Sequence, residues 1–132
     1  MIYIKQGEQK KFVIVDGAMN DLIRPTLYDG FHAIVPVTEK NLSSQKSLCD
    51  VVGPICESGD YFAKDRMLPE VSQNDLLAIT CSGAYGAVMA SNYNSRPLIP
   101  EVLVSNDVFS VIRERQAFEK IIQDEKLAVW LQ

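Results

Sequence analysis

Three features that would point to particular classes of protein are missing from this sequence. It has no uninterrupted apolar run of about 18 residues, the length at which a membrane-spanning helix becomes a candidate. Its opening, MIYIKQGEQKK, interleaves apolar and charged residues and lacks the basic-then-apolar order of a secretory signal. The 13 Lys and Arg are scattered among 17 Asp and Glu, whereas nucleic-acid binders gather basic residues on one face. We therefore predict a cytoplasmic protein with neither a membrane nor a nucleic-acid partner.

Residues that form disulfides or bind metals are also scarce. There are three cysteines, Cys49, Cys56 and Cys81, and a single histidine, His32. An odd number of widely spaced cysteines does not make a disulfide framework, and one histidine does not complete a zinc site with them. We predict reduced thiols and no metal site, in keeping with a cytoplasmic protein.

Short segments rich in Val and Ile dominate the 132 residues, a length that fits one domain. Turn-forming Gly, Asn, Asp and Ser separate these segments. Strands are predicted at residues 2–5, 11–16, 31–37, 50–55, 76–82, 101–105 and 108–113. Helices are predicted at 84–91 and 115–124, and a polar exposed loop at 39–47. The pattern is typical of a mainly β fold, an antiparallel β-barrel or β-sandwich with minor helix.

Three motifs follow one another along the chain. They are DGAMNDLIRPTLYDGFH at 16–32, DVVGPICESGDYFAKDRMLP at 50–69 and GAYGAVMASNYNSRPLIPEVLV at 83–104. Their order and spacing closely resemble the C-terminal β-barrel domain of diaminopimelate decarboxylase, a pyridoxal-phosphate enzyme of the fold-type III, alanine-racemase-like group. The resemblance extends from about residue 11 to residue 124. One small departure is DGAMND, where the family more often has the order Asp-Ala-Gly-Met-Asn-Asp.

The resemblance implies a particular domain organisation. Enzymes of this family begin with a TIM-type barrel that carries the Schiff-base lysine for pyridoxal 5'-phosphate, and their active site forms at a homodimer interface. Residues 1–132 would then be the C-terminal domain, with the N-terminal barrel absent from this chain. The direct start into a strand also suggests a longer polypeptide. We expect no decarboxylase activity from the isolated chain.

The resemblance also implies roles for five residues. Cys56 resembles the general acid that enters the active site across the dimer interface, and Glu57 resembles the carboxylate that binds the distal ammonium of meso-diaminopimelate. Arg24 and Tyr28 resemble the pair that holds the distal carboxylate of this substrate. Tyr85 resembles the tyrosine that lies beside the cofactor and approaches its phosphate. The implied reaction yields L-lysine, the last step of lysine biosynthesis.

These residue types suit the implied chemistry. Because diaminopimelate carries an ammonium and a carboxylate at each end, its selection requires a fixed cation and a fixed anion, and Arg24 and Glu57 supply them. A guanidinium suits a carboxylate because its planar fork donates two parallel hydrogen bonds. A cysteine thiol has an ordinary pKa of about 8.5, so at neutral pH it still carries the proton that Cys56 would deliver.

The sequence also leaves several alternative functions open. Decarboxylases of ornithine, arginine or related amino acids share a Gly-Pro-x-Cys turn but typically place aspartate after the cysteine, whereas Glu57 follows here. A non-catalytic regulatory homologue would be expected to have lost the site residues, and all are present. A nucleophilic pair of His32 and Cys56 is a further hypothesis. No functional role is assigned to Asn92, Tyr93, Asn94 and Asp60, and the Asp60 side chain is expected to cap the turn.

Overall fold

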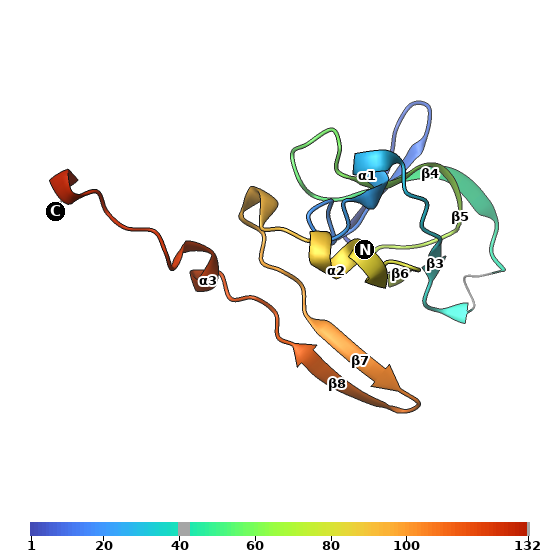
Figure 1. The fold of residues 1–132 in the computed structure, drawn as a ribbon. Coiled ribbons are helices and arrows are strands. Elements are labelled where there is room, and N and C mark those ends of the chain that lie inside the picture. Colours follow the sequence, from blue (N-terminus) through green and yellow to red (C-terminus); the bar gives the residue numbers. More distant parts are fainter. Residues whose placement is uncertain (40–42, 132) are drawn as a thin grey trace. The chain divides into compact units, whose positions relative to one another are not determined.

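The computed structural model describes residues 1–39 and 43–131, and the chain forms two compact units, Met1–Ala90 (unit 1) and Ser91–Gln132 (unit 2). Figure 1 shows the helices and strands of both units, coloured along the sequence from blue at the N-terminus to red at the C-terminus. Strands are the main regular structure and the helices are short, so the mainly β fold with minor helix is confirmed.

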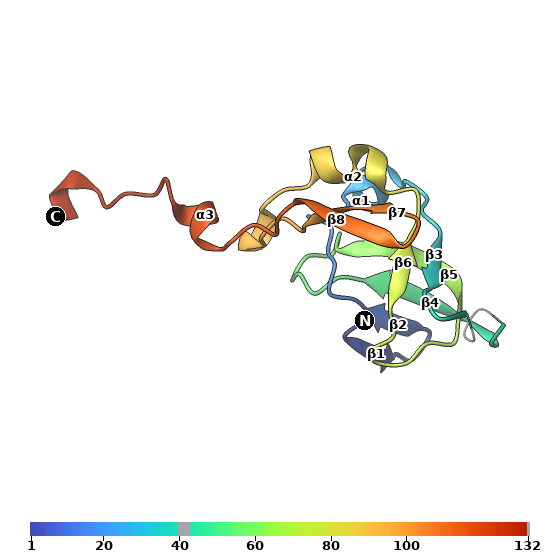
Figure 2. The same ribbon diagram turned by 90° about the horizontal axis from the view of Figure 1, so that it is seen from below.

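Unit 1 contains a four-stranded sheet in the order β1-β2-β4-β5 (Figure 2). Its strands are β1 (Tyr3–Gln6), β2 (Lys11–Ile14), β4 (Lys46–Val52) and β5 (Tyr61–Pro69). The β1–β2 and β4–β5 pairs are antiparallel, whereas β2 and β4 run parallel. The prediction of an antiparallel architecture is therefore wrong for this central pair. Parallel neighbours need a long crossover, which here passes through a helix and a further strand.

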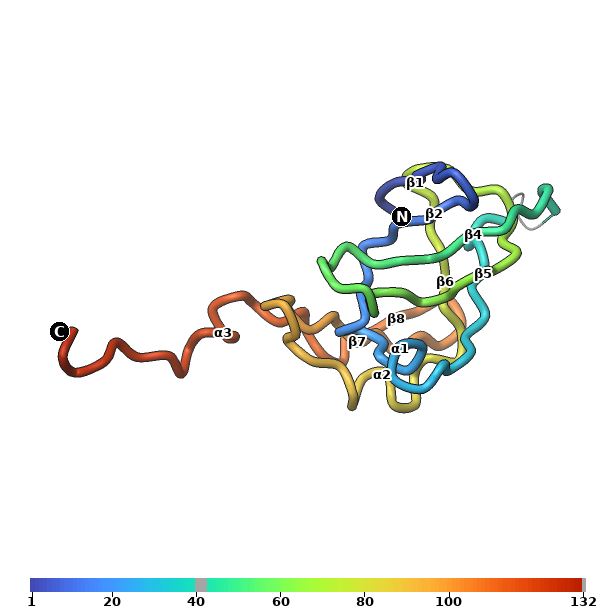
Figure 3. The backbone as a smooth tube through the Cα atoms, turned by 90° about the horizontal axis from the view of Figure 1, so that it is seen from above, coloured from blue at the N-terminus to red at the C-terminus, as the bar shows by residue number. Residues whose placement is uncertain are grey.

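A second, two-stranded ladder in unit 1 joins β3 (Ile34–Pro36) to β6 (Leu77–Ile79) in antiparallel register. The apolar core of the unit consists of side chains from both sheets and the segments between them, because alternate strand residues face inward. The core residues are Val13, Val15, Leu22, Ile34, Cys49, Val51, Phe62, Ala63, Leu68 and Val71. The helices α1 (Arg24–Tyr28) and α2 (Gly83–Met89) lie at the end of the unit opposite β1 (Figures 2 and 3).

Unit 2 is built around an antiparallel hairpin of β7 (Glu101–Ser105) and β8 (Val108–Arg113). The short helix α3 (Glu119–Ile122) and two 3₁₀ turns, η2 (Tyr93–Ser95) and η3 (Val129–Leu131), complete the unit.

Each predicted strand overlaps an observed one, and both strands of the hairpin have the predicted bounds. The nine-residue β5 is missing from the prediction because Lys64, Asp65 and Arg66 interrupt its apolar pattern. In the predicted loop at 39–47, residues 40–42 lie outside the described part, and Lys46 and Ser47 already belong to β4. The described strands form three separate sheets, so a single closed barrel is not what they make.

Helix α3 is shorter than the predicted 115–124, and the five-residue α1 was not predicted. Over residues 1–39 and 43–131, the structure has no helix with the length and apolar character that a membrane crossing requires.

Candidate functional site on helix α1 and the 54–60 turn

Helix α1 carries two of the predicted site residues at its two ends. Pro25 suits the first turn because its fixed backbone angle is already helical, and Asp29 ends the helix in the left-handed region with φ 57°. Arg24 and Tyr28 are four residues apart and so lie on one side of the helix. The Arg24 Nε donates a hydrogen bond of 2.7 Å to the Tyr28 hydroxyl. The predicted pair is therefore in direct contact.

Tyr85 joins this pair from α2. The Arg24 guanidinium carbon lies 6.0 Å from the centre of the Tyr85 ring and 5.7 Å from that of Tyr28. Both distances are in the range of cation–π attraction. Three predicted site residues thus meet in one cluster, called here the Arg24 cluster (Arg24, Tyr28 and Tyr85), and its two tyrosine rings are exposed.

The backbone at Tyr85 is strained. Its φ of 65° and ψ of −18° are uncommon for a residue with a bulky side chain. No glycine in the described chain has a positive φ, so the flanking Gly83 and Gly86 do not adopt the unusual backbone geometry. The strain falls on the tyrosine itself, at the position that faces Arg24.

The other two predicted residues lie on the turn that links β4 to β5. Cys56 and Glu57 are both exposed. The Glu57 Oε1 accepts the backbone N–H of Gly59 at 3.1 Å, and the Asp60 N–H donates to the Glu57 carbonyl at 3.0 Å. The turn therefore presents a thiol and an adjacent carboxylate to solvent.

Asp60, expected from the sequence to cap the turn, holds this turn in place. Its side chain is 4% exposed, its Oδ2 accepts the Ile55 N–H at 2.6 Å, and its Oδ1 accepts the Met19 N–H at 2.7 Å. A Cβ at Gly53 would lie 2.3 Å from the Asp60 Oδ2, so only glycine fits there. The signal in the sequence was the Gly-Pro before the turn and the Gly-Asp at its end, which are typical capping and turn residues.

Helix α1 is attached to the 54–60 turn. The Thr26 hydroxyl donates to the Gly59 carbonyl, and the Tyr61 hydroxyl donates to the Pro25 carbonyl at 3.4 Å. The approach is close enough that a Cβ at Gly59 would lie 2.8 Å from the Thr26 methyl. The structure thus places the cation-bearing helix and the thiol-bearing turn side by side. Thr26 is a contributor that sequence reasoning missed, as are the Asp60 bonds beyond a local cap.

The remaining cysteines and the histidine have different environments. Burial raises the pKa of the Cys49 thiol, which lies in the core and donates to the Arg66 carbonyl, whereas Cys81 is exposed. His32 is buried and its Nδ1 lies 3.0 Å from the Thr80 carbonyl. A His32–Cys56 nucleophilic pair has no support here, because the ring is engaged in the interior while Cys56 is exposed.

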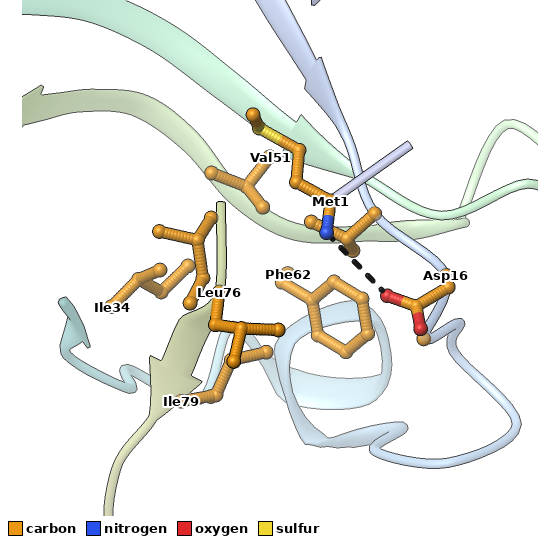
Figure 4. Close-up of a pocket in the computed structure, with 10 residues that line it drawn as sticks. Met1, Asp16, Ile34, Val51, Phe62, Leu76 and Ile79 are labelled. Carbon is orange, nitrogen blue, oxygen red and sulfur yellow. Dashed lines mark ion pairs between the residues drawn. The ribbon is translucent and has the colours of Figure 1, made fainter. Parts of the chain in front are cut away.

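An apolar cavity of about 270 Å³ lies elsewhere in unit 1 (Figure 4). Strand and loop residues of the core line it, including Val51, Phe62 and Ile79, and the Met1 amine pairs with Asp16 at its rim over 3.9 Å. None of the five predicted site residues belongs to its lining. Within the described ranges, no three His, Cys, Asp or Glu side chains are placed to share a metal ion. The candidate site is therefore the surface made by α1, the 54–60 turn and the start of α2.

Comparison with known proteins identifies the family. The model of a family described as pyridoxal-dependent decarboxylase, C-terminal sheet domain, matches residues 1–83. The chain belongs to this family.

Several similar proteins and solved structures are named diaminopimelate decarboxylase. The chain is 51% identical over 131 residues to a diaminopimelate decarboxylase of Zymomonas mobilis, a match that covers 99% of this chain and 30% of the relative. A crystal structure of diaminopimelate decarboxylase from M. jannaschii is 37% identical, with a TM-score of 0.91 over 99% of this chain and 30% of that one. The enzyme from Helicobacter pylori, complexed with L-lysine, is 49% identical, with a TM-score of 0.83 over 92% of this chain and 29% of that one. The chain spans about 30% of the length of these relatives.

Proposed function

We propose that this sheet domain is the C-terminal part of a diaminopimelate decarboxylase that converts meso-diaminopimelate to L-lysine in the cytoplasm. The single observation that carries the proposal is the Arg24 cluster held against the 54–60 turn, because it gathers a cation, two hydroxyl groups, a thiol and a carboxylate on one surface. Relatives at 37–51% identity are named as this enzyme, which supports the proposal.

The proposed substrate contacts follow from charge. The Arg24 guanidinium, oriented by its hydrogen bond to Tyr28, binds the distal carboxylate of the substrate, and the Tyr28 hydroxyl donates to the same group. Glu57 binds the distal ammonium, with its carboxylate oriented by the Gly59 N–H. A substrate that lacks either distal charge leaves one of these groups without its partner, which lowers its affinity.

The proposed cofactor is pyridoxal 5'-phosphate, bound by a Schiff-base lysine on an N-terminal barrel outside this chain. The residues present fit its phosphate: Tyr85 is 61% exposed and its ring lies beside the Arg24 cation, so its hydroxyl can donate to an anionic oxygen. When bound, the cofactor accepts the electron pair released as carbon dioxide leaves. Cys56, exposed on its turn, delivers a proton from Sγ to the carbon that has lost the carboxylate.

The proposed partners are the N-terminal barrel and a second copy of the enzyme. An active site completed across a dimer interface would explain why the site residues of this domain point to solvent. Exposed apolar side chains on the β7–β8 hairpin, among them Leu103, Phe109 and Ile112, offer further surface for contacts with a partner.

The test uses the full-length protein, with this chain following its own upstream region. Release of carbon dioxide is measured from meso-diaminopimelate and from L-ornithine. We expect turnover of the first and not of the second. Cys56→Ala should lower kcat by at least about 100-fold, the typical contribution of a general acid. Glu57→Gln should mainly raise KM for diaminopimelate, because the ammonium loses its charged partner.

Matched controls are available within the chain. Cys81→Ala removes another exposed free thiol and should leave kcat unchanged. Turnover of ornithine in place of diaminopimelate would favour the basic amino-acid decarboxylases. If the cofactor binds and neither substrate reacts, the domain belongs to a non-catalytic relative.

A further inference from the structure

His32 is a buried polar residue for which the proposed reaction has no use. Its side chain is 1% exposed, and its Nδ1 lies 3.0 Å from the Thr80 carbonyl. A carbonyl oxygen only accepts hydrogen bonds, so Nδ1 carries the proton and donates it. The second ring nitrogen, Nε2, is buried and has no hydrogen-bond partner among the described residues.

This arrangement shows what the histidine contributes. A buried polar atom without a partner costs free energy, so a site that needed only volume would be better filled by an apolar side chain. The ring is nevertheless present, and its one hydrogen bond joins segments 48 residues apart in the sequence, beside the backbone bond from the Thr80 N–H to the Ala33 carbonyl at 2.9 Å. The Nδ1–Thr80 bond is therefore the contribution that an apolar residue would lack.

One side of this bond leads back to Arg24. The Gly30 N–H donates to the Arg24 carbonyl at 3.0 Å, and a Cβ at Gly30 would lie 3.1 Å from the Arg24 Cβ, so the segment after α1 packs against its first residue. The same segment is held from β5, because Arg66 donates to the His32 carbonyl at 3.0 Å and stacks over the Phe31 ring at 4.1 Å. These contacts attach the segment that carries His32 to the Arg24 backbone and to β5.

The other side of the bond leads to Tyr85. Thr80 is the first residue after β6 and lies five residues before Tyr85 in the sequence. The intervening turn is tight: Cys81 has a φ of 56°, and the Ser82 hydroxyl donates to the Ile79 carbonyl at 3.0 Å. The contacts close a ring, because the Arg24 guanidinium in turn faces the Tyr85 ring at 6.0 Å.

We propose that His32 is a positioning residue, whose Nδ1–H bond to Thr80 sets the separation of the Arg24 and Tyr85 side chains. Its effect on catalysis rests on the function proposed above, since it acts through the residues that bind the distal carboxylate and the cofactor phosphate. The Cys56 turn is bonded to α1 through Thr26, but the Asp60 bonds that fix the shape of the turn lie outside this ring of contacts.

Two substitutions of His32 distinguish a positioning role from a packing role, because the two roles predict opposite rankings of the variants. In His32→Asn the amide nitrogen occupies the place of Nδ1 and keeps the bond to Thr80, but the smaller side chain leaves a cavity. In His32→Gln the volume is nearly kept, but the amide nitrogen takes the place of Nε2 and the bond is lost. If His32 served packing alone, His32→Gln would be less impaired than His32→Asn in every measurement.

Kinetic constants, cofactor affinity and melting temperature are measured in the full-length enzyme. We expect His32→Gln to raise KM for diaminopimelate and the dissociation constant of pyridoxal 5'-phosphate by about 10-fold, because a displacement of about 1 Å at a positioned group is enough for such losses. His32→Asn should stay within about 3-fold of the wild type in both constants, although its melting temperature falls more. The kcat of both variants should change less than KM, since the Asp60 bonds that fix the shape of the Cys56 turn are left in place.

Crystal structures of the two variants give a readout that does not depend on activity. The distance from the Arg24 guanidinium to the Tyr85 ring should be kept in His32→Asn and change by more than about 1 Å in His32→Gln. An unchanged distance in His32→Gln, or an Asn variant that is more impaired than Gln or fails to fold, would overturn the proposal. A wild-type enzyme inactive on diaminopimelate would overturn the proposed function alone, because the distances still decide the positioning role.

Discussion

Units 1 and 2 are stabilised by different kinds of contact. Every buried residue that the structure describes lies in unit 1, and all described residues of unit 2 are half-buried or exposed. Unit 1 combines an apolar core with side-chain bonds that cross long stretches of sequence, such as the one from Met19 to Asp60. Unit 2 depends on a hairpin ladder, the Arg113–Glu101 ion pair at 2.7 Å, and a small group of polar contacts.

This difference explains where the candidate site is found. Catalytic and binding groups must be held to a fraction of an ångström, which requires elements fixed by packing and by hydrogen bonds behind them. All five predicted site residues belong to unit 1, on loops and short helices supported by its core. Unit 2 presents apolar strand residues to its surroundings and so is better suited to contact than to chemistry.

The largest predicted loss of stability in unit 1 should come from Gly53→Ala. The added Cβ would lie 2.3 Å from the Asp60 Oδ2 and would displace the carboxylate that holds the Ile55 and Met19 N–H groups. Each hydrogen bond to a charged group contributes about 1.5 to 3 kcal/mol, so we expect a loss of about 3 kcal/mol or more in unit 1. Hydrogen exchange of the two amides in the full-length protein measures this loss.

Gly83→Ala is the matched control for this change. Nothing lies within 4 Å of a Cβ at Gly83, and no glycine in the described chain has a positive φ. Alanine should therefore be neutral or slightly stabilising at this position. Equal amide protection in the two variants would show that the Asp60 carboxylate does not hold the turn.

A smaller effect is expected in unit 2 from Asn92→Ala. The Asn92 amide donates to the Arg96 carbonyl at 2.8 Å and to the Gln116 Oε1 at 2.6 Å, and that oxygen also accepts the Leu98 N–H. These neutral bonds contribute about 1 kcal/mol each, so unit 2 should lose about 2 kcal/mol.

Faster hydrogen exchange at the amides of Leu98 and Gln116, without change in unit 1, is the expected signature. The exposed Gln123→Ala in the same unit serves as the control and should leave these amides unaffected. If the exchange of both units accelerates together, the two units unfold cooperatively, which would contradict the expectation that unit 2 opens separately from unit 1.

The sequence predicted the strands of both units better than their partners. The Val- and Ile-rich segments of β7 and β8 are predictable because turn residues separate them. Nothing in the local sequence of β2 and β4 indicates that these two strands pair in parallel. Residues of the Arg24 cluster could be predicted from their motifs. The distant partners of Asp60 and His32 could not be predicted, because they are backbone groups of Met19 and Thr80, 41 and 48 residues away, which only the folded chain brings near.

The smallest predicted effect is a loss of stability at alkaline pH that is confined to unit 1. Hydrogen bonds from Lys10 to the Asp50 and Asp65 carboxylates raise the Lys10 pKa above 10.5, and burial raises the Cys49 pKa above 9.0. A group whose pKa is higher in the folded state stabilises the fold fully below its unfolded pKa and loses that contribution as the pH rises through the folded value. Stability should therefore hold up to about pH 9 and decline above it, first through Cys49 and then through Lys10.

Cys49→Ala should remove the earlier part of this decline and Lys10→Met the later part, as measured by the exchange of unit 1 amides relative to those of unit 2 at each pH. Lys10 pairs with Asp50 at 2.8 Å and Asp65 at 3.2 Å, and Asp50 is itself buried, so Lys10→Met also lowers stability at neutral pH. Unit 2 contains neither group and should show no matching decline. A parallel loss in both units would mean that the alkaline transition arises from groups other than this thiol and this ammonium.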